Sequence, residues 1–285
     1  MASMREIKRR RGSIQSTQQI TKAMKLVSTV KLQRARTRAE ESKAYFNYMY
    51  KTITSMLARA GTVNHPYVRG NDSENIGIVV ITSNRGLAGG YNANIARMIM
   101  KSGCDKEKVR LYTVGRKGAE MLSRRGYEII EDYSEFIDDP VFVEAKQVGE
   151  KVLADYMSGE IGEIHVAYTE FKNTVSHIPK MLKLLPIEKE SVEIEELDPL
   201  TPMNFEPSEE EALGLLIPKY VTSILYGAFV ESVASENGAR MQAMESATNN
   251  AQEIISDLEL KYNRARQGAI TQELTEIIAG AEAIG

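Results

Sequence analysis

The sequence AITQELTEIIAGA, at residues 269–281, ends a helical pattern that begins near Ser208. After Gly238, neither a proline nor a pair of glycines interrupts this pattern. A helix from Ser208 to about Glu282 would be roughly 110 Å long, at about 1.5 Å per residue. Because ordinary globular helices are several times shorter, we expect a rod that extends beyond a single compact core.

A second long helix is predicted at the N-terminus. Ser3 and Glu6 have the spacing of a capping box, and no glycine or proline lies between Ser13 and Ala60. The apolar residues form one narrow stripe among lysines and arginines, so the helix needs a long partner to bury them. The stripe consists of Ile7, Ile14, Ile20, Met24, Val27, Val30, Ala35, Ala39, Phe46, Met49, Ile53 and Met56.

The C-terminal helix offers such a partner. Its capping box starts at Ser208, and Pro218 is expected to kink or interrupt its first turns. Further on, apolar and small residues recur in alternating steps of three and four, which is the heptad spacing of a coiled coil. These residues are Met241, Met244, Thr248, Ala251, Ile255, Leu258, Tyr262, Ala265 and Ala269. Two long helices at opposite ends of one chain most simply pair antiparallel, so we predict an intramolecular coiled coil.

Between the two helices the pattern becomes α/β. Apolar runs predict strands at residues 76–82, 109–114, 127–130, 163–172 and 177–185, and helical stretches fall near 92–101, 116–125 and 140–157. This alternation predicts a mainly parallel sheet. The predicted fold class is α/β, with a long antiparallel coiled coil of N- and C-terminal helices plus a central Rossmann-like α/β domain. We divide the chain into an N-terminal coiled-coil helix (1–60), a central α/β domain with its connector (61–207) and a C-terminal coiled-coil helix (208–285).

Charge and composition narrow the function. Residues 1–60 hold 14 basic and three acidic residues, a net charge of +11 in a chain whose net charge is −3. A basic helix binds acidic protein loops, binds nucleic acid phosphates, or forms a solvated face.

Cys104 is the single cysteine, which excludes an internal disulfide. The charged N-terminus lacks the pattern of a secretory signal, and no 18-residue run is uninterruptedly apolar, so we expect membrane association only through other subunits.

Residues 83–92 form a glycine-rich turn between a predicted strand and a predicted helix. Its G-x-x-G-G spacing matches neither a dinucleotide fingerprint nor a P-loop, so we predict a structural turn, and likewise for Gly115–Gly118. The histidines His65, His165 and His177 have no metal-ligand spacing. The sequence therefore predicts no catalytic, cofactor-binding or metal site. Two alternatives stay open at this point, a nucleotide-binding α/β protein and an RNA-binding protein, each with a coiled-coil arm.

The end of the C-terminal helix, from Gln267 to Ile284, outruns its predicted partner by about 30 Å. It carries Ile270, Leu274, Ile277 and Ile278. An exposed amphipathic helix of this kind has to be enclosed by something else. The alternative is a terminus that frays or folds back.

Three motifs resemble those of one family, the gamma subunit of the F-type ATP synthase, which is its central rotor shaft. They are Ile20–Met24, the turn at Ser83–Asn92, and the run from Tyr262 to Glu276 followed by Gly280–Ala281. The resemblance extends over the whole chain in order and spacing. It implies a bacterial type of subunit that is not itself an enzyme, needs no cofactor and is present in one copy per complex.

The resemblance also implies partners and contact residues. Met24 and Arg240 match positions that meet an acidic loop of the beta subunits, and Arg266 and Gln267 match a hydrogen-bonded catch with beta. Thr271, Glu273, Thr275 and Glu276 match polar positions near the tip. The expected partners are the alpha and beta subunits, epsilon and the c-ring, with no nucleic acid. The expected location is the cytoplasmic side of a bacterial cell membrane, as a peripheral protein.

Overall fold

A computed structural model describes residues 4–59, 65–187 and 208–282. Ser3, Ile284 and residues 188–207 of the predicted connector lie outside these ranges, as does the side chain of Phe46. The described chain forms two compact units. The first combines the residues before Thr29 with those after Arg240, and the second runs from Thr29 to Arg240.

Two long helices contribute to both units. α1 is Met4–Arg59, with 56 residues, and α6 is Glu209–Glu282, with 74 residues, which confirms the two predicted helices. The Ser208 side chain accepts a hydrogen bond from the Glu211 amide at 3.2 Å, as the capping box predicts. The predicted interruption at Pro218 is wrong, because α6 continues through it. Position i−4 from Pro218 is Gly214, and the helix is anchored there by Leu213, Ile217 and Val221, all fully buried.

In the first unit, α1 and α6 pair antiparallel. Four side-chain contacts between the helices show this. They are Lys25–Glu245, Thr21–Thr248, Gln18–Gln252 and Arg11–Glu259, so residue numbers fall along α1 as they rise along α6. Every predicted seam residue of α6 is buried or half-buried. The predicted coiled coil is confirmed here.

The predicted apolar face of α1 is partly wrong. Ile20, Val27 and Val30 are more than half exposed, at 60%, 57% and 54%. In this part of α1 the buried positions are instead Thr21 and Ser28, in the same heptad frame as the half-buried Ile14, whereas the predicted Ala35, Ile53 and Met56 are buried. Small side chains face α6 because they let the two backbones approach closely, and this turns the larger β-branched residues outward.

The second unit contains a five-stranded sheet with the order β3-β2-β1-β4-β5. The strands are β1 (Ile76–Ile81), β2 (Val109–Val114), β3 (Glu128–Asp132), β4 (Glu163–Phe171) and β5 (His177–Leu185). β1 pairs parallel with β2 and β4, β2 pairs parallel with β3, and β4 pairs antiparallel with β5. The predicted strands and the mainly parallel sheet are confirmed.

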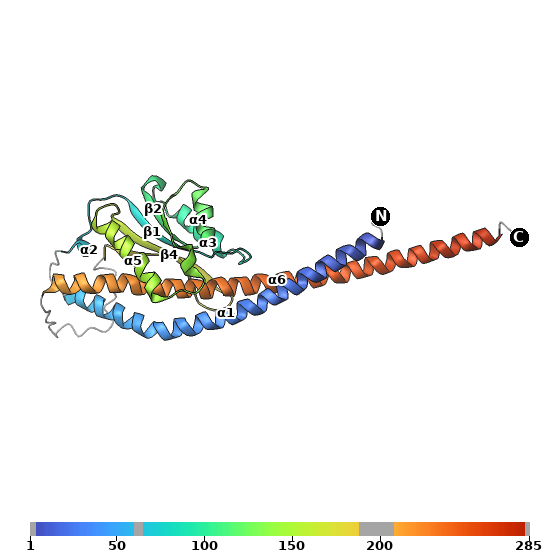
Figure 1. Cartoon of the computed structure of the whole chain (residues 1–285), viewed down its shortest axis with the longest axis horizontal. Coiled ribbons are helices and arrows are strands. Elements are labelled where there is room, and N and C mark those ends of the chain that lie inside the picture. Colours follow the sequence, from blue (N-terminus) through green and yellow to red (C-terminus); the bar gives the residue numbers. More distant parts are fainter. Residues whose placement is uncertain (1–3, 60–64, 188–207, 283–285) are drawn as a thin grey trace. The chain divides into compact units, whose positions relative to one another are not determined.

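Helices cover both faces of this sheet (Figure 1). They are α2 (Pro66–Arg69), α3 (Tyr91–Lys101), α4 (Arg116–Ser123) and α5 (Phe142–Met157), with short 3-10 turns at Lys106–Lys108 and Ser134–Ile137. Side chains alternate along β1, so that Ile78 and Val80 pack with α3 and α4 on one face. Val79 and Ile81 pack on the other face, with α5 and the first half of α6.

This packing explains the hydropathy of α6. By length and composition, α6 contains an 18-residue window apolar enough to cross a membrane, with a mean hydropathy of 1.5. In the structure, 56% of that window is buried. Residues such as Leu225 and Phe229 are fully buried against the sheet, so the apolar character serves the core of the second unit.

Candidate functional site

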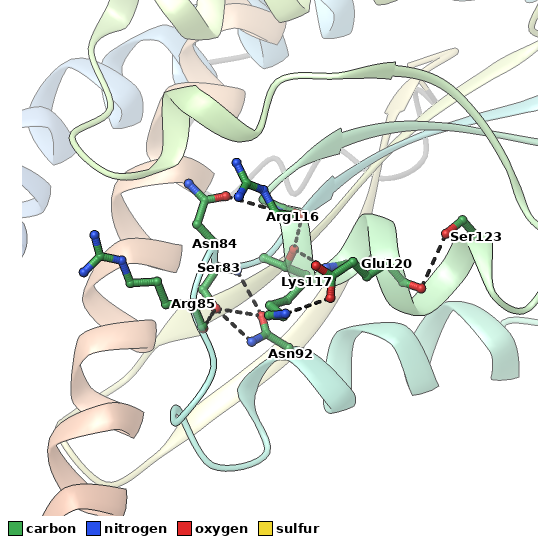
Figure 2. A network of polar contacts seen from close by, with 11 residues as sticks. Ser83, Asn84, Arg85, Asn92, Arg116, Lys117, Glu120 and Ser123 are labelled. Carbon is green, nitrogen blue, oxygen red and sulfur yellow. Dashed lines mark hydrogen bonds and ion pairs between the residues drawn. The ribbon is translucent and has the colours of Figure 1, made fainter. Parts of the chain in front are cut away.

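The glycine-rich turn after β1 is fixed by its own polar side chains (Figure 2). The Asn92 carboxamide oxygen accepts from the Ser83 amide at 2.9 Å, and its nitrogen donates to the Ser83 hydroxyl at 2.8 Å. Asn84 accepts from the Arg116 amide at 3.0 Å, at the start of α4. The turn therefore ties the N-termini of α3 and α4 together.

The first amides of α4 are all engaged by this region. The Lys117 amide donates to the Ser83 carbonyl at 3.0 Å, and the Gly118 amide donates to the Thr82 hydroxyl at 2.9 Å. Gly115 has φ of 120°, and a Cβ there would lie 2.0 Å from the Thr82 carbonyl oxygen. A phosphate at this helix end would need donors that the protein already uses, so the geometry is that of a structural turn.

The tip of the turn is unusual in one respect. Leu87 has φ of 63°, a left-handed conformation that is rare for a residue with a branched side chain, and its side chain is 63% exposed. The turn that follows β1 thus exposes an apolar side chain to solvent.

Arg240, one of the predicted partner contacts, is buried in the second unit with 9% exposure. Its guanidinium pairs with Glu236 at 2.6 Å and donates to the carbonyl oxygens of Arg85 and Gly86, each at 3.3 Å. Met24, which the resemblance groups with Arg240, is half-buried in the first unit. The hydrogen-bond partners of the Arg240 guanidinium are therefore groups of this same chain.

The other predicted contact residues lie in the first unit, on the last turns of α6. Arg266 and Gln267 are exposed, and so is every residue from Thr271 to Ala281. Hydrogen bonds of this stretch run along the helix, from the Thr271 hydroxyl to the Gln267 carbonyl at 2.9 Å and from Thr275 to Thr271 at 2.8 Å. The predicted residues Glu273 and Glu276 share this surface.

The same stretch exposes its apolar side chains. Ile270, Leu274, Ile277 and Ile278 are 49%, 55%, 68% and 60% exposed. Toward the N-terminal side, Arg11 of α1 still covers the ring of Tyr262, with 5.8 Å from its guanidinium carbon to the ring centroid. In the first unit, α6 therefore carries an apolar surface past the point where α1 covers it.

The histidines occupy separate structural places. His65 caps α2 by accepting from the Tyr67 amide at 3.2 Å, His165 bonds Glu163 at 2.7 Å, and His177 packs against Gly238. Burial lowers the pKa of both His65 and His177. Among the residues that the structure describes, no group of three or more His, Cys, Asp or Glu side chains is placed to hold a metal ion.

Sequence reasoning missed Glu236 and the two asparagines of the turn. A signal for Glu236 existed, because Glu236 and Arg240 have the i,i+4 spacing of a helical ion pair. Asn84 and Asn92 gave no comparable signal, because Asn84 pairs with backbone atoms of Arg116 and Ser134, and Asn92 pairs with Ser83 at a spacing that no helix or strand pattern indicates.

Long paired helices and a mainly parallel α/β sheet are features that this chain shares with ATP synthase central-stalk chains, as the following comparisons show. The family model described as ATP synthase matches residues 3–284. The chain is 59% identical over 290 residues to the ATP synthase gamma chain of Lachnoclostridium phytofermentans, covering 100% of both chains. It is 40% identical to the sodium ion specific ATP synthase gamma chain of Acetobacterium woodii, covering 99% of each.

Solved structures show the same fold. The central stalk of the Tetrahymena thermophila mitochondrial ATP synthase matches with a TM-score of 0.59 and 26% identity, covering 80% of this chain and 99% of that one. A chain of the Euglena gracilis mitochondrial ATP synthase matches with a TM-score of 0.71 and 20% identity, covering 99% and 94%. The chain belongs to the ATP synthase gamma family.

Proposed function

We propose that this chain is the central rotor shaft of an F1Fo ATP synthase and transmits torque between the membrane c-ring and the catalytic alpha/beta hexamer. It couples ion flow to ATP synthesis or hydrolysis and has no catalytic site of its own. The observation that carries this proposal is the uncovered end of α6, with its exposed apolar side chains from Ile270 to Ile278. Such a surface requires an enclosing partner.

The physical basis of coupling is asymmetry. A rod of two unequal helices inside a ring of three equivalent sites contacts each site differently at any instant. Rotation then carries each site through different affinities for nucleotide, because an equilibrium shifts only by a differential interaction with its two states. The shaft needs no reacting groups for this task.

We assign the partners by surface. The alpha and beta subunits enclose the C-terminal end of α6, and the central domain at 61–207 contacts epsilon and the c-ring. The helical segments 1–60 and 208–285 act as the shaft, one copy per complex, on the cytoplasmic side of the bacterial cell membrane as a peripheral protein. The exposed residues Arg266, Gln267, Thr271, Glu273, Thr275 and Glu276 contact the hexamer, as does Met24.

The test uses the double variant Arg266→Ala/Gln267→Ala in the assembled complex. Both side chains are exposed, so we expect normal folding of the chain and weaker coupling, measured as ion pumping per ATP hydrolysed. The matched control is Asn249→Ala/Asn250→Ala, which removes two adjacent exposed polar side chains from the same helix. Normal ion-driven synthesis together with normal assembly in the first variant would count against the catch.

A further inference from the structure

We propose that Glu236 and Arg240 form a latch that fixes the glycine-rich turn to the part of α6 that lies in the second unit, so that this part of α6 and the sheet move as one body. The inference rests on the proposed rotor function, because a shaft can pass torque through its α/β domain only if the two do not slip. Arg240 is then a positioning residue.

The geometry of the latch engages three acceptors. One guanidinium nitrogen of Arg240 lies 2.6 Å from a Glu236 carboxylate oxygen, and another lies 3.3 Å from each of the Arg85 and Gly86 carbonyl oxygens. A planar guanidinium donates several hydrogen bonds in fixed directions, which a lysine ammonium does not reproduce. The directed hydrogen bonds of the Arg240 guanidinium therefore fix the position of the glycine-rich turn relative to α6.

The latch is buried. The Arg240 and Glu236 side chains are 11% and 12% exposed. Burial raises the pKa of Glu236, and the charge of Arg240 opposes this shift. At the far end of the turn, burial raises the pKa of Tyr91, which also feels the charges of Glu236 and Arg240. Low exposure strengthens such contacts and leaves little room for water to replace them.

The turn that the latch holds also contacts the neighbouring helices, and Figure 2 shows its residues Ser83, Asn84 and Asn92. Ser83 and Asn84 accept from the first amides of α4, and the Asn84 side chain donates to the Ser134 carbonyl at 2.7 Å. Asn92, in the first turn of α3, accepts a hydrogen bond from the Ser83 amide and so links α3 to the turn. A displacement of α6 at Arg240 is thereby carried to the ends of β1 and β2 and to two helices.

This arrangement gives Arg240 a role different from the partner contact that the resemblance implies. Its donors are directed at Glu236 and at two backbone carbonyls of its own chain. Reaching a partner would break these bonds and leave the Glu236 carboxylate buried without its cation, which is unfavourable. The geometry favours the internal role.

The experiment uses the assembled ATP synthase with Arg240→Ala, the charge-neutral pair Glu236→Gln/Arg240→Met, and the control Lys219→Ala, an exposed cation on the same helix. Hydrogen exchange is followed at the amides of Ser83, Arg116 and Lys117. Coupling is measured as ion pumping per ATP hydrolysed. We expect about tenfold faster exchange at these amides and lower coupling in both latch variants, and wild-type values in the control.

The double variant keeps the proposal testable where Arg240→Ala fails to fold, because it leaves no unpaired buried charge. Unchanged exchange in the double variant would overturn the latch. Faster exchange with the coupling of the control would overturn the positioning role. If the proposed rotor function itself were wrong, the result would be different from these. A complex that contains the wild-type chain would then pump ions no better than a complex that lacks the chain.

Discussion

The two units of this chain bury side chains in different ways. The second unit packs both faces of a sheet, and Ile78, Val79, Val80 and Ile81 of β1 are all fully buried. The first unit has a narrow seam in which Thr21 and Ser28 are buried with Met244 and Leu258. The sheet core buries many large apolar side chains, whereas in the seam the apolar residues of α6 are buried together with small hydroxyl residues of α1.

The difference indicates where stability lies. Apolar burial supplies most of the stabilising free energy of a fold, and fully buried aromatic side chains contribute the most per residue. The seam of the first unit buries fewer apolar side chains. Its cross-helix hydrogen bonds, Thr21 with Thr248 and Gln18 with Gln252, each contribute only about 1 kcal/mol. We therefore expect mutations to have large effects in the second unit and smaller ones in the first, in the order that follows.

The largest effect is expected from Phe229→Ala in the second unit. The Phe229 side chain is fully buried between α6 and the sheet, and its removal leaves a cavity. We expect a loss of about 3–5 kcal/mol in the free energy of unfolding, measured by urea denaturation of the purified chain. The control Leu215→Ala, at a side chain 67% exposed on the same helix, should cost less than about 1 kcal/mol. Equal costs would contradict the comparison.

A pH dependence is expected next, from His177 in the hairpin of β4 and β5. Burial lowers the pKa of His177 in the folded chain, so the folded state binds fewer protons than the unfolded state, whose histidine titrates near about 6.5. The contribution of His177 to the free energy of unfolding is then fully present above that pH. It is lost as the pH falls through this value toward the folded pKa, by at most about 1.4 kcal/mol per pH unit.

Urea denaturation between about pH 5 and pH 7.5 measures this slope. His177→Gln should reduce this slope without abolishing it, because the contribution of His65, whose pKa burial also lowers, remains. The control Val175→Thr changes an exposed residue of the same hairpin and should keep the wild-type slope. A slope unaffected by His177→Gln would show that another group carries the dependence.

An effect of about 1 kcal/mol is expected in the seam of the first unit. The Thr21 and Thr248 hydroxyls lie 2.7 Å apart, so Thr21→Val or Thr248→Val leaves one hydroxyl without its cross-helix partner. The double variant should cost less than the sum of the single variants, as a double-mutant cycle of denaturation midpoints will show. Thr17→Val, at an exposed threonine of α1, serves as the control. Strict additivity would mean that this contact does not couple the helices.

The smallest effect on the chain itself is expected at the uncovered end of α6. Leu274→Ser and Ile277→Ser alter side chains that are 55% and 68% exposed, so the free energy of unfolding should change by less than about 0.5 kcal/mol. Binding to the alpha/beta hexamer, measured by titration, should weaken on the order of tenfold per substitution because an apolar contact is lost. Unchanged binding with unchanged stability would contradict the proposed enclosure.

Much of the fold could be predicted from the sequence. Heptad steps between Met241 and Ala269 correctly indicated the seam of α6, and short apolar runs indicated all five strands. The spacing was misleading for α1, where Ile20 and Val27 are apolar but exposed. Periodicity reports which residues share a face of a helix, and it does not report which face the partner covers. The contact residues near the tip remain a prediction.

The sequence by itself determined the elements of this protein, because helical length, capping at Ser208 and the glycines of the turn are local properties of the chain. Only the tertiary structure decided how α6 is used. Its first half completes the core of a sheet, and Arg240 turns toward the carbonyls of Arg85 and Gly86, 155 and 154 positions earlier in the chain. The physical reason is that hydrogen bonds between a side chain and a distant backbone depend on three-dimensional placement, which no local pattern encodes.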